Sequence, residues 1–411
     1  MRKDGKRLRW DNRQVNLGIY ISVPFCKTKC SYCNFASDVF SRAVFARYVD
    51  RLCSDIENAR KTAAELGGRI EPEVDSIYLG GGTPTVLEAA QLRRVFDAVR
   101  AHFSVRADAE ITVECAPGTL APDILETLLA CGVNRVSLGV QSFVDTEAAA
   151  VGRLHKRETV LNDVSRLRAG GIANINIDLI AGLPHQTAES WTVSLAETIA
   201  TSAPHVSVYM LEVDEDSRLG RELIAGGTRY HAHFVPDEDA VADLYTAASE
   251  TLEAAGIAQY EISNFARPGF ESRHNLKYWT RQPYLGFGVD AHSMLAAADP
   301  AFDAVRLATA DALEKYAAGS PLIRTAVSRA SALEERFFLG LRLNRGVDLR
   351  EIAGAFGQPA LDSLRSAIAD LVRDGLLQQS GPCIRLTSRG RLFSNEVFQA
   401  FLAPAGVASQ A

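Results

Sequence analysis

The sequence lacks the features of several protein classes. None of its apolar runs approaches the ~20 residues that a membrane-spanning helix needs. The formal net charge of −6 at pH 7 leaves no excess of basic residues for nucleic-acid phosphates. Basic residues near the amino terminus are not followed by an apolar segment, so they do not form a secretory signal. We therefore expect no integral membrane segment and no nucleic-acid partner.

Cysteine is scarce, and its distribution argues against a disulfide framework. The chain has seven cysteines, an odd number, and four are scattered singly at Cys53, Cys115, Cys131 and Cys383. Unpaired cysteines are typical of a reducing compartment, so we expect a cytoplasmic protein. The other three cysteines occur together.

These three thiols follow an apolar segment that begins at Leu17. The segment is rich in Ile, Val and Tyr, which predicts a buried strand ending at Pro24. Cys26, Cys30 and Cys33 then occur with the spacing C-x3-C-x2-C. Three thiolates can hold three irons of a 4Fe-4S cluster and leave the fourth iron open for chemistry. A zinc site with a distant fourth ligand is the alternative, although zinc ligands usually come in two separated pairs.

A repeated strand–helix pattern follows the thiol loop. It recurs about six times, which predicts a parallel sheet, either open or curled into a partial barrel. From about residue 330, short amphipathic helices precede a predicted hairpin at residues 376–386, an order similar to a winged-helix module. The predicted division is an N-terminal tail at 1–16, a core at 17–295 and a helical C-terminal domain at 296–411.

Polar and glycine residues gather at the carboxyl ends of the predicted strands, the edge that carries the site in parallel α/β folds. A carboxylate there can bind the ribose hydroxyls of a nucleoside, and an arginine can clamp a carboxylate. Glycines allow close backbone approach to a ligand. Capping of the following helix is the alternative role for the acidic residues. The residues concerned are Gly80, Gly81, Gly82, Thr83, Glu114, Gln141, Arg153 and Asp178.

The thiol triplet after a strand resembles the radical S-adenosylmethionine (SAM) superfamily from Tyr20 to about Met294. The resemblance implies a partial (β/α)6 barrel whose open cluster iron binds the amino and carboxylate groups of SAM. One electron from the cluster then cleaves the sulfonium and yields a 5′-deoxyadenosyl radical. The cofactor carries this chemistry, and the protein supplies binding and shielding.

Further motifs narrow the resemblance. GGGTPT, ECAPGT, LGVQSF, GRLH, DLIAGLP and HNLKYW, in this order, are similar to the oxygen-independent coproporphyrinogen III oxidase-like family. The match covers nearly the whole chain, including the helical C-terminal part. Carried over residue by residue, it implies SAM contacts at Tyr20, Gly81, Gly82, Thr83, Glu114, Gln141, Arg153 and Asp178.

Two departures favour the heme-chaperone branch of this family over the true oxidases. The oxidases carry a further cysteine where this chain has Phe35, and their N-terminal extension is longer. The segment His274–Trp279 resembles the HNxxYW element of the chaperone branch, which implies heme or a porphyrin as ligand. A neutral imidazole is a common ligand of heme iron, so His274 is the candidate ligand.

Three hypotheses follow. The preferred one is a heme chaperone that delivers heme to respiratory hemoproteins. The alternatives are coproporphyrinogen III dehydrogenase, which would make the protein an enzyme of porphyrin biosynthesis, and a zinc-stabilised α/β protein without radical chemistry. A homodimer is compatible with the thiol loop lying near a surface. We expect His155, His185, His231 and His233 to be surface or capping residues.

Overall fold

The computed structural model describes residues 15–212 and 214–402. The predicted N-terminal tail at 1–16 therefore lies outside the described residues except for residues 15 and 16. Among the described helices, none is both long enough and apolar enough to cross a membrane.

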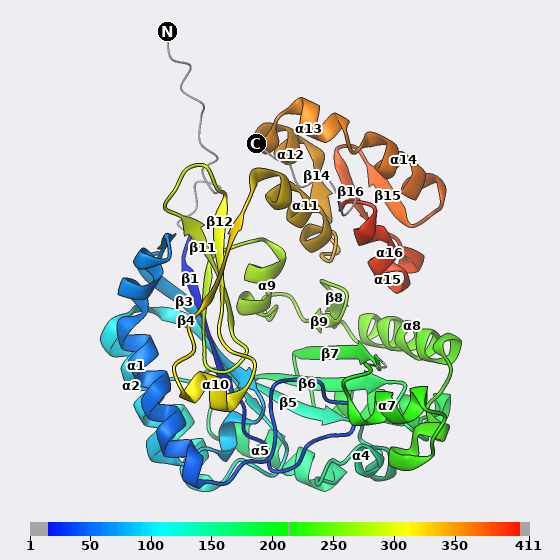
Figure 1. The fold of residues 1–411 in the computed structure, drawn as a ribbon. Helices are drawn as coiled ribbons and strands as arrows, with labels where there is room; N and C mark the ends of the chain where they lie inside the picture. Colours follow the sequence, from blue (N-terminus) through cyan, green and yellow to red (C-terminus); the bar gives the residue numbers. More distant parts are fainter. Residues whose placement is uncertain (1–14, 213, 403–411) are drawn as a thin grey trace.

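Six parallel strands form the centre of the molecule in the order β1-β3-β4-β5-β6-β7 (Figure 1). Helices connect them, as right-handed crossovers require. This arrangement confirms the α/β fold with a parallel core that the strand–helix repeat predicts. The strands are β1 (Leu17–Val23), β3 (Glu73–Gly81), β4 (Ser104–Cys115), β5 (Arg135–Gln141), β6 (Asn174–Ala181) and β7 (His205–Met210). The crossover helices are α1 (Ala43–Glu65), α2 (Ala89–His102), α3 (Pro122–Ala130), α4 (Asp145–Ala150), α5 (Arg157–Ala169) and α6 (Ala188–Ala200), with the 3-10 turn η1 (Pro84–Val86).

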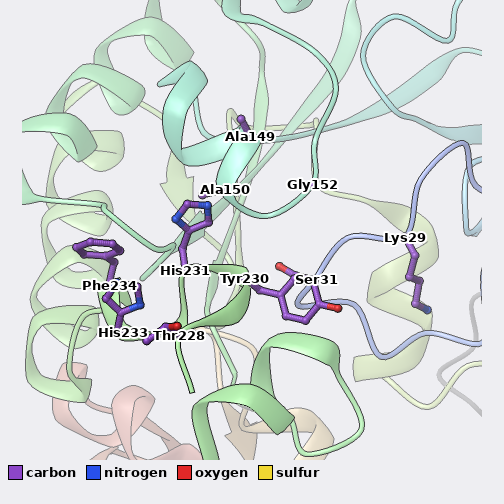
Figure 2. Close-up of a pocket in the computed structure, with 10 residues that line it drawn as sticks. All are labelled: Lys29, Ser31, Ala149, Ala150, Gly152, Thr228, Tyr230, His231, His233 and Phe234. Atoms are coloured by element: carbon purple, nitrogen blue, oxygen red, sulfur yellow. The ribbon is translucent and has the colours of Figure 1, made fainter. Parts of the chain in front are cut away.

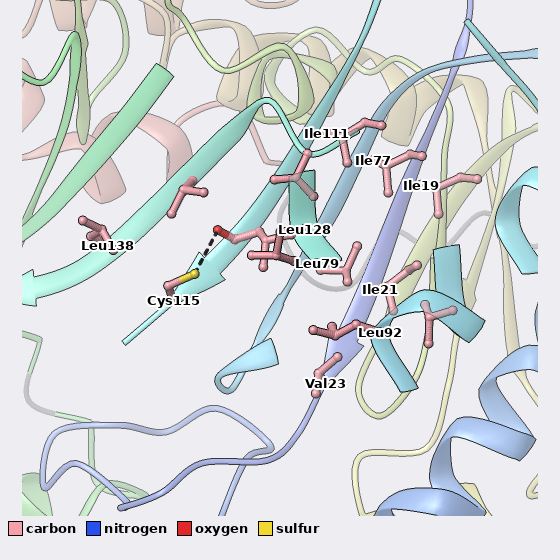
Figure 3. Close-up of a cluster of buried hydrophobic side chains, with 14 of the residues drawn as sticks. Ile19, Ile21, Val23, Ile77, Leu79, Leu92, Ile111, Cys115, Leu128 and Leu138 are labelled. Atoms are coloured by element: carbon pink, nitrogen blue, oxygen red, sulfur yellow. Dashed lines mark hydrogen bonds between the residues drawn. The ribbon is translucent and has the colours of Figure 1, made fainter. Parts of the chain in front are cut away.

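Alternation along each strand decides which side chains face the helices. In β1, Ile19, Ile21 and Val23 are fully buried and pack with Leu79 and Leu92 (Figure 3). Side chains of successive strand residues point to opposite faces, so Tyr20 and Ser22 face the other side of the sheet. Burying an aliphatic side chain of this size stabilises the fold by ~1.5–3 kcal/mol. The helix-covered face thus provides stability, and the opposite face is free to carry polar groups.

Short strands extend both edges of the parallel core. On one edge β10 pairs with β1, and β11, β12 and β13 follow as an antiparallel ribbon; on the other edge β9 pairs with β7, and β8 pairs with β9. The predicted boundary between residues 295 and 296 falls inside β11, so the main sheet continues well past it. The bounds are β2 (Gly68–Arg69), β8 (Ala258–Gln259), β9 (Asn264–Ala266), β10 (Tyr284–Phe287), β11 (His292–Ala297), β12 (Ala304–Ala308) and β13 (Ile323–Val327). Between these strands lie α7 (Arg218–Ile224), η2 (Arg229–Phe234), α8 (Glu238–Ala254), α9 (Arg273–Trp279) and α10 (Leu313–Ala317).

The C-terminal part has its own apolar core. Phe337 and Phe401 stack with ring centroids 4.7 Å apart, and Leu341 and Ile384 are fully buried beside them. Helices followed by a hairpin confirm the helical C-terminal region. The elements are α11 (Arg329–Gly340), β14 (Val347–Asp348), α12 (Leu349–Phe356), α13 (Gln358–Asp362), α14 (Arg365–Arg373), β15 (Leu377–Ser380), β16 (Cys383–Leu386), α15 (Ser388–Leu392) and α16 (Ser394–Gln399).

Candidate functional site

The loop that carries the three thiols is closed by backbone hydrogen bonds at its base. The N–H of Cys26 donates to the carbonyl of Asp38, and the N–H of Asp38 donates to the carbonyl of Pro24, both at 3.0 Å. Farther along, the carbonyl of Ser31 accepts from the N–H of Leu219 at 2.7 Å. The loop is therefore held in place at the carboxyl end of β1.

Each of the three thiols has a different polar neighbour. Thr83 Oγ1 lies 3.8 Å from Cys26 Sγ, and Arg153 Nη1 lies 3.6 Å from Cys30 Sγ. Cys33 Sγ lies 3.9 Å from Ser37 Oγ. Burial raises the pKa of the Cys26 thiol.

The three thiols share one loop. Across residues 15–212 and 214–402, no group of three His, Cys, Asp or Glu side chains forms a site for a single metal ion. All ligands of zinc contact the same atom. An iron–sulfur cluster instead takes each thiolate on a different iron. The loop supplies one thiolate for each of three irons, as such a cluster requires.

The glycine run after β3 packs tightly against the start of the thiol loop. The N–H of Gly82 donates to the carbonyl of Val23 at 2.9 Å, and the N–H of Thr83 donates to the carbonyl of Phe25 at 2.8 Å. A Cβ on Gly82 would lie 2.7 Å from the oxygen of Val23. Gly81 has φ +95°, a conformation that favours glycine. The run thus brings backbone amides up to the thiols where no side chain fits.

Two carboxylates share the mouth of the parallel core. Glu114 accepts from the hydroxyl of Tyr78 at 2.9 Å and from the N–H of Gly81 at 3.2 Å. Asp178 accepts from Ser137 Oγ at 2.9 Å and from Asn176 Nδ2 at 2.7 Å. Burial, followed by repulsion from Asp178, raises the pKa of Glu114 to about 7. Burial likewise raises the pKa of Asp178.

Arg153 and Gln141 complete this mouth. Arg153 Nη2 donates to the carbonyl of Gly139, and a Cβ on Gly139 would collide with the same guanidinium group. Arg153 Nε is buried without a hydrogen-bond partner. Gln141 has φ +69° at a register shift between β5 and β6, which aims its side chain away from the regular ladder. Buried donors without a hydrogen-bond partner and residues with a strained backbone are common at functional sites.

Tyr20 lies on the same face of the sheet. Its ring stacks on Tyr78 with centroids 6.2 Å apart, and its hydroxyl would lie 3.4 Å from a Cβ on Gly81. Burial raises the pKa of Tyr20 further above its usual range. The structure therefore brings together eight of the nine residues expected to bind cofactors, around the thiol loop.

His274 is the exception. It belongs to α9, and its ring lies beside Gly18 and Ser76 in the first halves of β1 and β3, with its centroid 6.4 Å from that of Tyr20. Its side chain is 1% exposed, Nδ1 lies 3.0 Å from Ser76 Oγ, and Nε2 lies 2.9 Å from Tyr278 Oη. Burial lowers the pKa of His274 to about 3, so the imidazole is neutral. Both ring nitrogens are engaged, and neither is open to a heme iron.

Polar residues inside the parallel core are not predicted from the strand ends alone. Asn176 bonds to Ser137 and Ser207, and His205 Nδ1 lies 2.6 Å from Asn176 Oδ1. Arg135 is 1% exposed on the same face. The sequence does carry an indication of this polar face, because polar residues recur at every second position of these strands.

The four histidines expected to be surface or capping residues fall into two groups in the structure. His155 is buried, its Nε2 lies 3.1 Å from the carbonyl oxygen of Val140, and burial lowers its pKa to about 4. The expectation of a surface or capping role is wrong for His155, because its ring is buried and bonds to the backbone of β5 instead of a helix end. His185, His231 and His233 are exposed, as expected.

Comparisons with known proteins place these features in a family. Residues 20–196 match the Radical SAM superfamily, and residues 327–393 match the HemN C-terminal domain. The chain is 36% identical to "Heme chaperone HemW" of Bacillus subtilis, over 93% of this chain and 98% of that protein. It is 32% identical to "Heme chaperone HemW" of Escherichia coli, over 94% and 98%.

Among solved structures, the chain is similar to the coproporphyrinogen III oxidase HemN of Escherichia coli, described as a radical SAM enzyme. The TM-score is 0.79 at 26% identity, covering 94% of this chain and 90% of that one. The similarity extends through both the parallel core and the helical C-terminal part.

Proposed function

Because the chain belongs to the HemW family of the radical SAM superfamily, we propose that it is a heme chaperone. It binds heme and delivers it to respiratory hemoproteins. Membership over nearly the full length of the relatives is the observation that carries this proposal. The acidic composition and the seven unpaired cysteines support action in the cytoplasm.

The superfamily implies a 4Fe-4S cluster and SAM, and we propose that the mouth of the parallel core holds both. Cys26, Cys30 and Cys33 ligate the cluster. When bound, the cluster and SAM together supply one-electron chemistry. The fit is supported by the three free thiols on one loop and by the buried, unpartnered Nε of Arg153.

The protein's own groups bind and orient SAM in this proposal. Gly81, Gly82 and Thr83 present the backbone next to the thiols, and Tyr20 flanks them. Glu114 and Asp178 accept hydrogen bonds from hydroxyl groups of the nucleoside. Arg153 pairs with a carboxylate, and Gln141 adds an amide donor. Packing between the glycine run and the thiol loop excludes bulk water at that point.

A second candidate is coproporphyrinogen III dehydrogenase, favoured by the structural similarity to HemN. The presence of Phe35 argues against the dehydrogenase candidate. This side chain is 65% exposed on the thiol loop, where the oxidases have a cysteine. A phenyl ring supplies neither a thiol nor a proton, so any oxidase step that needs this cysteine cannot occur here.

Two measurements on the anaerobically reconstituted full chain test the proposal. Iron analysis should give about four irons per chain, as a 4Fe-4S cluster requires. The reduced protein is then incubated with SAM and coproporphyrinogen III. The proposal predicts no protoporphyrinogen beyond the no-enzyme control. Multiple turnovers to protoporphyrinogen would establish the dehydrogenase instead.

A further inference from the structure

A cavity lies directly beside the thiol loop, and none of the residues assigned to SAM lines it. Its volume is about 610 Å³, within the ~300–1,000 Å³ typical of small-ligand sites. Lys29 and Ser31 of the thiol loop form one wall, and the turn at Gly152 forms another (Figure 2). The third wall is the segment 228–234, which contains Tyr230, His231, His233 and Phe234.

The backbone of this wall is strained. Tyr230 has φ +56° and His231 has φ +59°, and the facing His185 has φ +68°. Non-glycine residues rarely adopt positive φ, and such strain is concentrated at functional sites. The N–H of His185 donates to the carbonyl of Phe234 at 3.0 Å, which ties the two strained segments together. The strained backbone at these three residues places the imidazoles of His185 and His231 side by side.

One of the two imidazoles lines the cavity, and the other contacts it from outside the cavity lining. His231 Nδ1 lies 3.0 Å from His185 Nε2, so one ring nitrogen of each is engaged. His231 lines the cavity and His185 does not, so His185 supports His231 from behind. Metal-bound histidines commonly donate their second ring N–H to such a partner.

The surroundings suit a flat, anionic macrocycle better than a bare ion. Within the described parts of the chain, three metal-binding side chains nowhere meet around one point. Heme iron needs only one or two protein ligands, because the porphyrin supplies four nitrogens. Tyr230 offers aromatic surface for the macrocycle, beside Phe234, whose ring packs against His185 and His233. Lys29 offers a cation for a propionate, with its ammonium held by the carbonyls of Phe35 and Ser37 at 2.8 and 2.5 Å.

We propose that heme binds in this cavity with His231 Nε2 as iron ligand, His185 as the residue that positions it, and Lys29 beside a propionate. This inference rests on the proposed function as a heme chaperone and assigns its ligand a place. His274, whose two ring nitrogens bond to Ser76 and Tyr278, takes no part in ligation.

Hemin titration of the reconstituted full chain tests the site. His231→Ala should weaken hemin binding by at least about tenfold and remove the histidine-ligand signature from the absorption and EPR spectra. His102→Ala is the matched control, because His102 is an exposed histidine at the end of α2 and should leave both unchanged. Unchanged affinity and spectrum in His231→Ala, with wild type binding hemin normally, would overturn the site and leave the proposed function standing. Failure of the wild type to bind hemin would reject the proposed function itself.

Two further measurements separate iron ligation from a loss of shape. Metal-free protoporphyrin IX should bind wild type and His231→Ala equally, since no iron is present; a parallel loss would indicate a collapsed pocket and contradict the assignment. His185→Ala should shift the EPR signature of bound hemin, and His185→Gln should restore it because the amide oxygen also accepts a hydrogen bond. An unshifted spectrum in His185→Ala would contradict its positioning role.

Discussion

The surroundings of Glu114 change the pH at which its carboxyl group loses its proton. Its carboxyl is held by Tyr78 and by the backbone of Gly81, while burial raises its pKa to about 7. Because a group with a raised pKa favours the folded state in its neutral form, its contribution to stability is lost as pH rises through 7. A ligand that donates hydrogen bonds to the ionised carboxylate should bind more tightly as pH rises, because a larger fraction of Glu114 is then ionised.

The first prediction concerns this carboxylate. SAM affinity of the reconstituted protein should rise by about tenfold between pH 6 and pH 8, as the ionised fraction of Glu114 rises. Glu114→Gln should bind SAM more weakly and lose this pH dependence. Isothermal titration at several pH values measures both. A wild-type pH profile in Glu114→Gln would show that another group is responsible.

The second prediction concerns His274. Replacing it with alanine leaves Ser76 and Tyr278 without their partner in a buried place, so His274→Ala should destabilise the fold by ~2–4 kcal/mol. Urea unfolding measures the loss. Hemin affinity of the protein that remains folded should match wild type. A specific loss of hemin binding at full stability would return His274 to the role of ligand.

The strand order explains why residues far apart in the sequence lie together in the mouth. Glu114 and Gln141 lie at the ends of β4 and β5, and Asp178 lies inside the neighbouring β6, so the parallel topology brings them together. His274 differs because its environment depends on how α9 packs against β1 and β3. His185 and His231 are 46 residues apart, and no local pattern links them.

At the scale of elements, the junction between the glycine run and the thiol loop is the part on which the cofactor site depends. The strand–helix alternation predicts the parallel core, because apolar periodicity distinguishes buried strands from amphipathic helices. Strands β8 to β13 could not be predicted in the same way. They are short, and β10 and β11 are defined by the neighbours they pair with.

The third prediction tests that junction. A methyl group at Gly82 would lie within 2.8 Å of the carbonyl oxygens of Val23 and Phe25, so Gly82→Ala must displace the start of the thiol loop. Iron content after reconstitution should fall to less than about half of the wild-type value. Gly354→Ala is the matched control, because nothing lies within 4 Å of the added methyl group. Full iron content in Gly82→Ala would mean that the loop tolerates the shift.

At the scale of the whole molecule, buried charges join the main sheet to the C-terminal helices. Arg281 Nε donates to Glu335 at 2.6 Å and Nη1 donates to Asp303 at 3.0 Å, while Arg306 pairs with the other oxygen of Glu335 at 2.9 Å. Arg281 is 1% exposed. Glu335 belongs to α11, whereas the arginines belong to the sheet side, so the network spans the junction.

The fourth prediction follows from this burial. Glu335→Ala removes one of the two carboxylates that pair with the buried guanidinium group of Arg281, and the carboxylate that pairs with Arg306, so it should cost ~3 kcal/mol in unfolding free energy. Limited proteolysis should then cut near residue 328 and release the C-terminal helices. Asp362→Ala, which removes only the exposed pair with Arg365, should cost less than about 1 kcal/mol. Equal stability of the two variants would contradict the structural role of the network.

The measurement that tests the central claim most directly is an anaerobic hemin titration of the full chain with its cluster in place, followed by the heme absorption band. A heme chaperone must bind its cargo at a defined site, so binding should saturate at equimolar hemin with the spectrum of a histidine-ligated iron. Hemin uptake that rises without saturation, or the spectrum of free hemin throughout, would contradict the account.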